Sequence, residues 1–196
     1  MKRITKYVLL FTFLATSFSC AQRKITRVSP STQTDLSGRW NDTDSKLVAT
    51  EMISDILGQA WLENFRSANG GKKPVLIVGL ITNKSSEHIE SETFVKDIER
   101  ELINSGRARI VQNDAFREKL RQERAQQGEF ASKETQAKWG LELGADYMLF
   151  GVINSTVDSY KKEKVVNYKV NLELADLETT EKVWIGDKEI KKYIKN

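Results

Sequence analysis

The only cysteine of this 196-residue chain, Cys20, directly follows an apolar N-terminal segment. Residues 1–19 begin with basic residues, continue through an apolar stretch and end in mostly small residues. This pattern predicts an export signal, and the apolar stretch is too short for a transmembrane helix of ~20 residues. Without a second thiol the exported part cannot form a disulfide or a cysteine metal site within one chain. The fold must therefore be held by its hydrophobic core alone.

The surroundings of Cys20 indicate a covalent lipid. Ser19 and Ala21 flank it as in a bacterial lipobox, in which the cysteine is diacylated and becomes the mature N-terminus. Ser17 stands three places before it, where an aliphatic residue is usual. The alternative is an ordinary signal peptide with an incidental cysteine in its cleavage region. We expect residues 1–19 to be a lipoprotein signal peptide and Cys20 to carry the lipid.

Removal of this signal leaves a chain of nearly balanced charge. Three of the 31 Lys and Arg residues lie within residues 1–19, so 28 basic and 27 acidic residues remain. A groove for nucleic acid needs a basic excess on one face. We therefore expect no nucleic-acid partner.

The remaining residues divide into a tether and one domain. Residues 20–44 are rich in Ser, Thr, Gln and Arg and lack an apolar period, which indicates a flexible tether. Residues 45–196 are long enough for a single globular domain. A helix predicted over residues 45–66 opens it, with apolar residues recurring at three and four positions. Trp61 and Phe65 lie on this stripe, where the spacing favours core packing over an aromatic binding box.

The later pattern predicts a mixed β-sheet flanked by helices, an α/β (α+β) fold. Two unbroken apolar segments, 74–81 and 146–153, are typical of strands covered on both faces. The helix between the first of these and the short strand 109–111 predicts a right-handed crossover. Strict alternation further along the chain predicts a half-buried antiparallel strand. The predicted strands cover residues 74–81, 109–111, 146–153, 166–174 and 183–190, and the predicted helices cover residues 45–66, 91–105, 116–127 and a segment from Ser132.

Signatures of catalysis are mostly absent. His88 is the only histidine, so a nucleophilic triad or a zinc helix has no second histidine to support it. The chain has no glycine-rich phosphate loop. Carboxylates around Asp42 and Glu87 can meet in space, but helix capping by Asp42, Asp44 or Ser45 and solvation explain them more simply. We expect no enzyme, no metal and no cofactor apart from the lipid on Cys20.

Two polar segments are the candidates for binding a partner. Residues 83–89 follow the carboxyl end of a buried strand, where α/β sheets commonly present functional loops. The second segment lies around Trp40, just before the first helix. A loop histidine that bonds locally is the alternative for His88, and the basic residues near the C-terminus are typical of a solvated strand edge. The candidate residues are Trp40, Asn41, Asp42, Asn83, Lys84, Ser85, Glu87 and His88.

Four stretches of the sequence resemble one known family. Residues 38–45, residues 73–79 with 83–89, residues 144–151 and residues 182–184 resemble the LpoB-type lipoprotein activators of penicillin-binding proteins, and the likeness covers about residues 36–190. It implies a single domain related to the N-terminal domain of TolB, held in the periplasm by a lipid. It also implies binding to a bifunctional transglycosylase/transpeptidase, a penicillin-binding protein whose glycan polymerisation and cross-linking the family stimulates.

The resemblance also suggests where the protein is located. Ala21 lacks the Asp that retains lipoproteins at the inner membrane in enterobacteria, so we expect a monomer anchored in the outer membrane and facing the periplasm. The alternative function is a CsgG-like secretion or assembly lipoprotein, or another structural envelope component. Such a channel needs long amphipathic hairpins, which the short predicted turns do not favour. A periplasmic hydrolase is a third class, but it lacks a recognisable nucleophile and base.

Overall fold

The computed structural model describes residues 25–130 and 142–195. The signal segment, Cys20 and most of the helix expected from Ser132 lie outside these residues. The chain separates into two units, one ending at Thr32 and one beginning at Gln33. None of the helices in the described part has the length and apolar character needed to cross a membrane.

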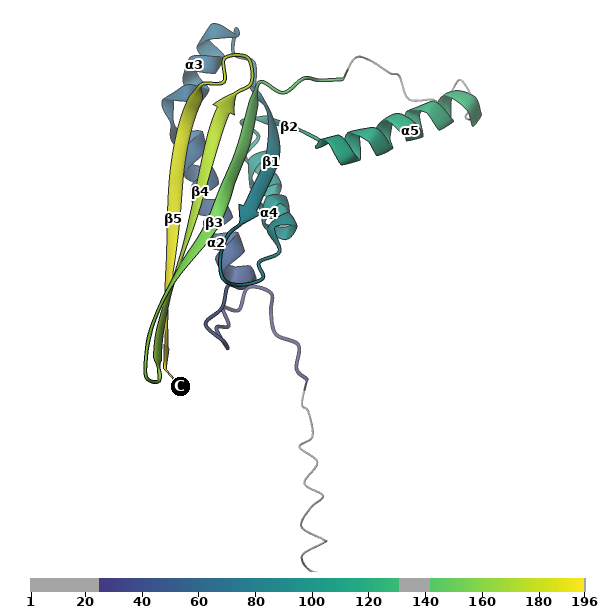
Figure 1. The fold of residues 1–196 in the computed structure, drawn as a ribbon. Coiled ribbons are helices and arrows are strands. Elements are labelled where there is room, and N and C mark those ends of the chain that lie inside the picture. The colour runs from purple at the N-terminus through teal and green to yellow at the C-terminus, as the bar shows by residue number, and fades with distance from the viewer. Residues whose placement is uncertain (1–24, 131–141, 196) are drawn as a thin grey trace, which may run out of the picture. The chain divides into compact units, whose positions relative to one another are not determined.

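The second unit is built on a five-stranded mixed sheet with the strand order β2-β1-β3-β4-β5 (Figure 1). Strand β1 pairs in parallel with β2 and with β3, while β4 pairs antiparallel with both β3 and β5. The predicted mixed sheet is therefore confirmed. The strands are β1 (Val75–Asn83), β2 (Arg109–Val111), β3 (Tyr147–Tyr160), β4 (Glu163–Asp176) and β5 (Lys182–Lys195).

Helices α2 (Asp42–Gly58) and α4 (Ser91–Ser105) pack on one face of this sheet and enclose the core with it (Figure 1). Helix α4 has the predicted bounds and forms the crossover between the parallel strands β1 and β2. Its apolar stripe supplies Phe94, Ile98 and Leu102, which are all fully buried. Helix α5 (Asp114–Phe130) has no buried side chain among its described residues, as its polar sequence predicts.

The first predicted helix is two helices, because the chain is extended at Gln59. Helix α2 ends at Gly58, and α3 (Ala60–Ala68) begins after Gln59, whose φ and ψ are −86° and 159°. Glycine weakens a helix, and the new direction lets the Trp61 indole N–H donate to the Ile56 carbonyl at 2.7 Å. That bond satisfies one of the carbonyls left free at the end of α2. The expectation that Trp61 belongs to the core is confirmed.

The start of α2 also differs from the expectation. The helix begins at Asp42, three residues before Ser45, because Asn41 is its N-cap. The Asn41 side-chain oxygen accepts bonds from the backbone N–H groups of Thr43 and Asp44 at 3.0 and 3.2 Å. In return, the Asp44 carboxylate accepts from the Asn41 backbone N–H at 2.9 Å, which completes a capping box. The predicted caps Asp42 and Ser45 are therefore helical residues.

Strand β1 is not covered on both faces along its whole length. Val75 to Val78 are buried in succession, as the apolar run predicts, but the side chain of Leu80 is 76% exposed. The register of β1 on β3 shifts between Val78 and Ile81. At such an irregularity the side chains no longer alternate strictly between the two faces of the sheet. Leu80 therefore faces solvent, while Ile81 points into the core.

Strands β3, β4 and β5 extend beyond the predicted segments, each to 14 residues. The end of β5 and the tip of the β3–β4 hairpin lie at the end of the unit where α2 begins (Figure 1). Strand β4 alternates between buried and partly buried positions, which confirms the predicted half-buried strand. The extension places the last residues of β5 beside the segment that leads into α2.

Gly151 of β3 allows β4 to approach closely. A Cβ atom at this position would overlap the Asn171 carbonyl oxygen and the Leu172 side chain. Both neighbours belong to the paired strand β4 and cannot move aside without disturbing the ladder. Close packing therefore explains this glycine, as expected for a glycine within a strand.

We expect Gly151→Ala to lower the free energy of unfolding by about 1–3 kcal/mol, because the added methyl group overlaps the backbone. Urea unfolding of the full chain, followed by circular dichroism, measures this change. Gly58→Ala is the control, since a Cβ atom at Gly58 meets nothing within 4 Å. It should leave stability unchanged or raise it by up to ~1 kcal/mol. Equal stability of the two variants would contradict the assignment.

Candidate functional site

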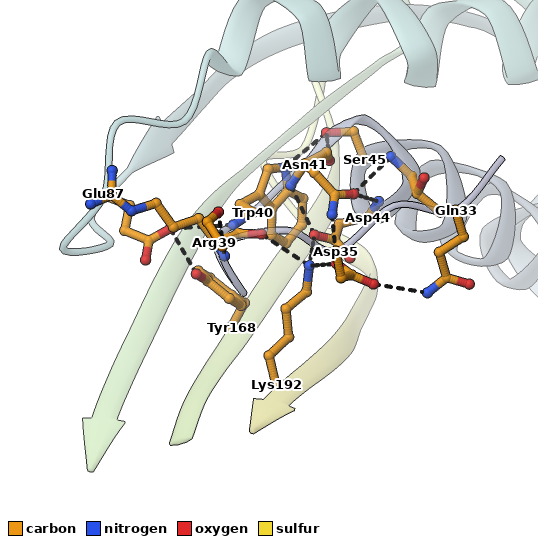
Figure 2. Close-up of polar contacts among 12 residues, drawn as sticks. Gln33, Asp35, Arg39, Trp40, Asn41, Asp44, Ser45, Glu87, Tyr168 and Lys192 are labelled. Carbon is orange, nitrogen blue, oxygen red and sulfur yellow. Dashed lines mark hydrogen bonds and ion pairs between the residues drawn. The ribbon is translucent and has the colours of Figure 1, made fainter. Parts of the chain in front are cut away.

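The two segments expected to bind a partner meet in the structure at the carboxylate of Glu87. One of its oxygens accepts a hydrogen bond from the Trp40 backbone N–H at 3.2 Å and another from the Tyr168 hydroxyl at 2.7 Å (Figure 2). Trp40 precedes α2 and Tyr168 lies in β4. Glu87 thus joins three parts of the chain that are far apart in sequence.

The Trp40 ring holds this junction to the core. It packs edge-to-face against Phe94 and Tyr168, with ring centroids 6.3 and 5.5 Å apart. Its indole N–H donates to the Ser45 hydroxyl at 2.8 Å. Because both its apolar surface and its polar atom have partners, Trp40 anchors the segment before α2 to the sheet.

Tyr168 is a fully buried side chain that donates its hydroxyl hydrogen to Glu87. Burial raises the pKa of the Tyr168 phenol well above its usual value, and the hydrogen bond to the Glu87 carboxylate raises it further. The phenol therefore remains protonated, and hence a donor, at physiological pH.

A lysine at the end of β5 ties the same segment down. The Lys192 ammonium lies 2.6 Å from carboxylate oxygens of both Asp35 and Asp44, and it donates to the Arg39 carbonyl at 3.0 Å (Figure 2). The side chains of Lys192 and Asp44 are only 10% and 8% exposed. We call residues 33–41 the lead-in segment. It lies against β5 through this ion cluster.

The charges of the cluster stabilise one another. Burial lowers the pKa of Lys192, but the hydrogen bonds to Asp35 and Asp44 outweigh it and the net shift is upward. The hydrogen bond from Lys192 lowers the pKa of Asp35, and a second one from Gln33 adds to this effect. Lys192 therefore stays charged next to the ionised Asp35 carboxylate at neutral pH.

Residues 84–90, here called the Glu87 loop, are held by side-chain hydrogen bonds. The Asn83 side-chain oxygen accepts from the backbone N–H and the hydroxyl of Ser85 at 2.9 and 2.7 Å. Its amide nitrogen donates to the Glu87 carbonyl at 2.8 Å. The Ser86 backbone N–H donates to the Ser155 hydroxyl of β3 at 3.0 Å. The loop is therefore pre-organised and does not depend on a ligand for its shape.

The eight candidate residues thus come together but play different parts. Five of them, Trp40, Asn41, Asn83, Ser85 and Glu87, make the bonds that shape the junction, the helix cap and the loop. Three are exposed, namely Asp42, Lys84 and His88. Asp42 forms an ion pair with Lys46 at 3.1 Å. The His88 side chain is 92% exposed. Its Nε2 lies 3.7 Å from the Glu90 carboxylate.

Sequence reasoning missed the roles of Tyr168, Lys192 and Asp35. The sequence pattern predicts that the basic residues near the C-terminus are solvated, but Lys192 has three hydrogen-bond acceptors within the protein. One signal was present in the sequence. Alternate residues of a strand point to the same face, so Lys192 lies on the same face of β5 as Ile190 and Ile194, which both pack against the core. A lysine within such a series indicates a buried ion pair. No comparable local signal marked Asp35.

Across residues 25–130 and 142–195, no group of three or more His, Cys, Asp or Glu side chains is placed to hold a metal ion.

We expect Lys192→Met to lower the free energy of unfolding by about 1–3 kcal/mol, because it leaves the buried Asp44 carboxylate without its cation. Urea unfolding of the full chain checks this value. Lys191→Met removes the neighbouring exposed lysine and should change stability by no more than ~0.5 kcal/mol. A similar loss in both variants would show that general charge, not the ion cluster, is responsible.

The family model described as peptidoglycan-synthase activator LpoB matches residues 44–190. A search of curated proteins finds no match.

Solved structures with a similar fold include three from bacteria. The LpoB C-terminal domain from Escherichia coli is 18% identical, with a TM-score of 0.46, covering 78% of this chain and 99% of its own. The same domain from Salmonella enterica is 15% identical, with a TM-score of 0.44 and coverages of 75% and 98%. The lipoprotein GNA1162 from Neisseria meningitidis is 12% identical, with a TM-score of 0.39 and coverages of 62% and 84%.

The match of the family model extends from the first turn of α2 into β5. It therefore includes the Glu87 loop, Tyr168 and the parallel strands β1, β2 and β3. Because it covers most of the 196 residues, the chain belongs to the LpoB family of peptidoglycan-synthase activators.

Proposed function

We propose that this protein is a lipid-anchored periplasmic regulator that binds a bifunctional peptidoglycan synthase, a penicillin-binding protein, and stimulates it. The observation that carries the proposal is the match of the activator family over residues 44–190. The protein acts as a monomer and contributes no catalytic group. Its effect comes from binding alone.

The exposed part of the Glu87 loop is the proposed contact surface. Lys84 and His88 are exposed, while the Asn83, Ser85 and Glu87 side chains hold the loop in one shape. A loop already fixed in its bound shape loses little conformational entropy on binding. Asp42 is a further proposed contact, because it is exposed on the first turn of α2 and the helix fixes its position. Trp40, Asn41 and Asn83 contribute by keeping these side chains in place.

The mechanism requires only a difference in affinity. An activator shifts a synthase toward its active conformation if it binds that conformation more tightly than the resting one. A tenfold preference corresponds to ~1.4 kcal/mol of stabilisation of the active state. A rigid surface suits this task, because a loop that adapted equally well to both conformations would shift neither.

The proposed anchor is a lipid on Cys20 in the outer membrane, with the domain facing the periplasm. Because the lead-in segment lies against β5, only about 13 residues separate Cys20 from Gln33. Such a stretch spans at most ~45 Å when fully extended. The synthase must therefore bring its docking surface to within this distance of the anchor, plus the distance from Gln33 to the Glu87 loop.

We expect the double variant Lys84→Ser, His88→Ser to weaken binding to a purified bifunctional penicillin-binding protein by at least about tenfold, as interface residues of central importance do. Biolayer interferometry with the full chain measures the affinity. A glycan-polymerisation assay with the same synthase should show a matching loss of stimulation.

The control for this variant is Lys72→Ser, Lys73→Ser, which removes two exposed basic residues in the segment between α3 and β1. It should bind and stimulate like the unaltered protein. If the unaltered chain neither binds a synthase nor changes polymerisation, the proposed function is wrong. If it does both and the loop variant behaves like the control, the contact surface lies elsewhere.

The anchor is tested separately. We expect cells that express the chain to incorporate radiolabelled palmitate into it, and Cys20→Ala to abolish the label because no other thiol is present. Fractionation should find the unaltered protein in the outer membrane and the variant outside it. Label that persists in Cys20→Ala, or an unaltered protein found free of membrane, would contradict the anchor.

A further inference from the structure

A cavity of about 720 Å³ lies at the other end of the sheet from the Glu87 loop, between α3 and the turn from β4 to β5 (Figure 1). Strand β5 runs from this cavity to the ion cluster, and the ten residue steps from Lys182 to Lys192 span ~33 Å. The cavity is therefore separate from the proposed contact surface, and the inference below does not depend on the proposed function.

Aromatic rings form one wall of the cavity. Trp61 and Phe65 of α3 pack edge-to-face on Tyr147 of β3, with ring centroids 5.1 and 5.7 Å from it. The break at Gln59 directs α3 so that these rings reach the sheet. The aliphatic part of a ligand can pack on this wall, and aromatic ring faces attract cations.

Carboxylates form the rim. The side chains of Asp146, Asp176, Glu178 and Glu181 all line the cavity. Glu178 and Glu181 are exposed and have no ion-pair partner within the described part of the chain. The one basic residue among those lining the cavity, Lys182, is paired with Glu173 at 2.7 Å. The rim therefore carries uncompensated negative charge.

The Tyr147 side chain completes the site. Tyr147 is 7% exposed and lines the cavity, and its hydroxyl has no hydrogen-bond partner among the residues that the structure describes. Burial raises the pKa of this phenol, and the charges of Asp176, Asp146 and Glu181 raise it further. Its oxygen is therefore free to accept a hydrogen bond from a ligand N–H.

We propose that this cavity binds a cationic group, an ammonium or guanidinium on an aliphatic stem. The rim carboxylates and the Tyr147 oxygen receive the N–H groups, and the Trp61 and Phe65 rings contact the stem. A lysine or arginine side chain of another protein and a free alkyl amine share this chemistry. The cavity selects for it because an anion would be repelled by the carboxylates, and a purely apolar group would cover Glu178 and Glu181 without pairing them.

NMR titration of the full chain tests the proposal through the indole N–H resonance of Trp61. The probes are acetylated and amidated Gly-Lys-Gly and Gly-Arg-Gly peptides, the uncharged analogue Gly-norleucine-Gly, and n-butylamine. The charged probes should shift the resonance in a saturable manner and the norleucine peptide should not. Binding by the peptides alone would identify a protein side chain as the ligand, and equal binding of butylamine a free amine.

Variants separate specific binding from general attraction. Glu178→Gln, Glu181→Gln should weaken binding roughly two- to thirtyfold, and Tyr147→Phe roughly two- to tenfold, without unfolding the protein. The control Glu118→Gln, Glu123→Gln removes the same charge from the exposed helix α5 and should bind like the unaltered chain. Equal binding of norleucine, no saturable shift with any charged probe, or equal affinities of all variants would overturn the proposal.

Discussion

The ion pair between Lys192 and Asp44 joins the first turn of α2 to the end of the last strand. Both side chains are almost fully buried, so neither charge can be left alone without a large cost in free energy. Asp44 also closes the capping box with Asn41, and Lys192 also holds the lead-in segment through Asp35. The position of the helix start and of the lead-in segment therefore depends on this contact between the two ends of the domain.

From this fixed start, a second set of bonds shapes the Glu87 loop. The cap residue Asn41 holds the backbone next to it in place, so the Trp40 backbone N–H can donate to Glu87. Glu87 in turn accepts a hydrogen bond from the hydroxyl of Tyr168, which is buried in the core. The loop therefore inherits its shape from the packing of the domain. The shape of an exposed loop can therefore depend on buried residues as much as on exposed ones.

The mixed sheet and α4 could be predicted because apolar periods and helix signals are local in sequence. The break at Gln59 could not, since the apolar stripe continues through it to Trp61 and only the bond to Ile56 reveals the turn. The two candidate segments lie side by side in the structure, joined by the hydrogen bond from Trp40 to Glu87. The inward direction of Glu87 and the ion pairing of Lys192 follow from tertiary contacts, which no local pattern encodes.

The attachment of the lead-in segment to β5 has a consequence for how often the domain meets a target near its anchor. For a flexible linker, the effective concentration at short range rises as the free length falls, roughly as the −3/2 power. If Cys20 is the anchor, holding residues 33–41 against the sheet shortens the free linker from about 25 to about 13 residues. The local concentration of the domain then rises roughly two- to threefold, at the expense of the distance that it can explore.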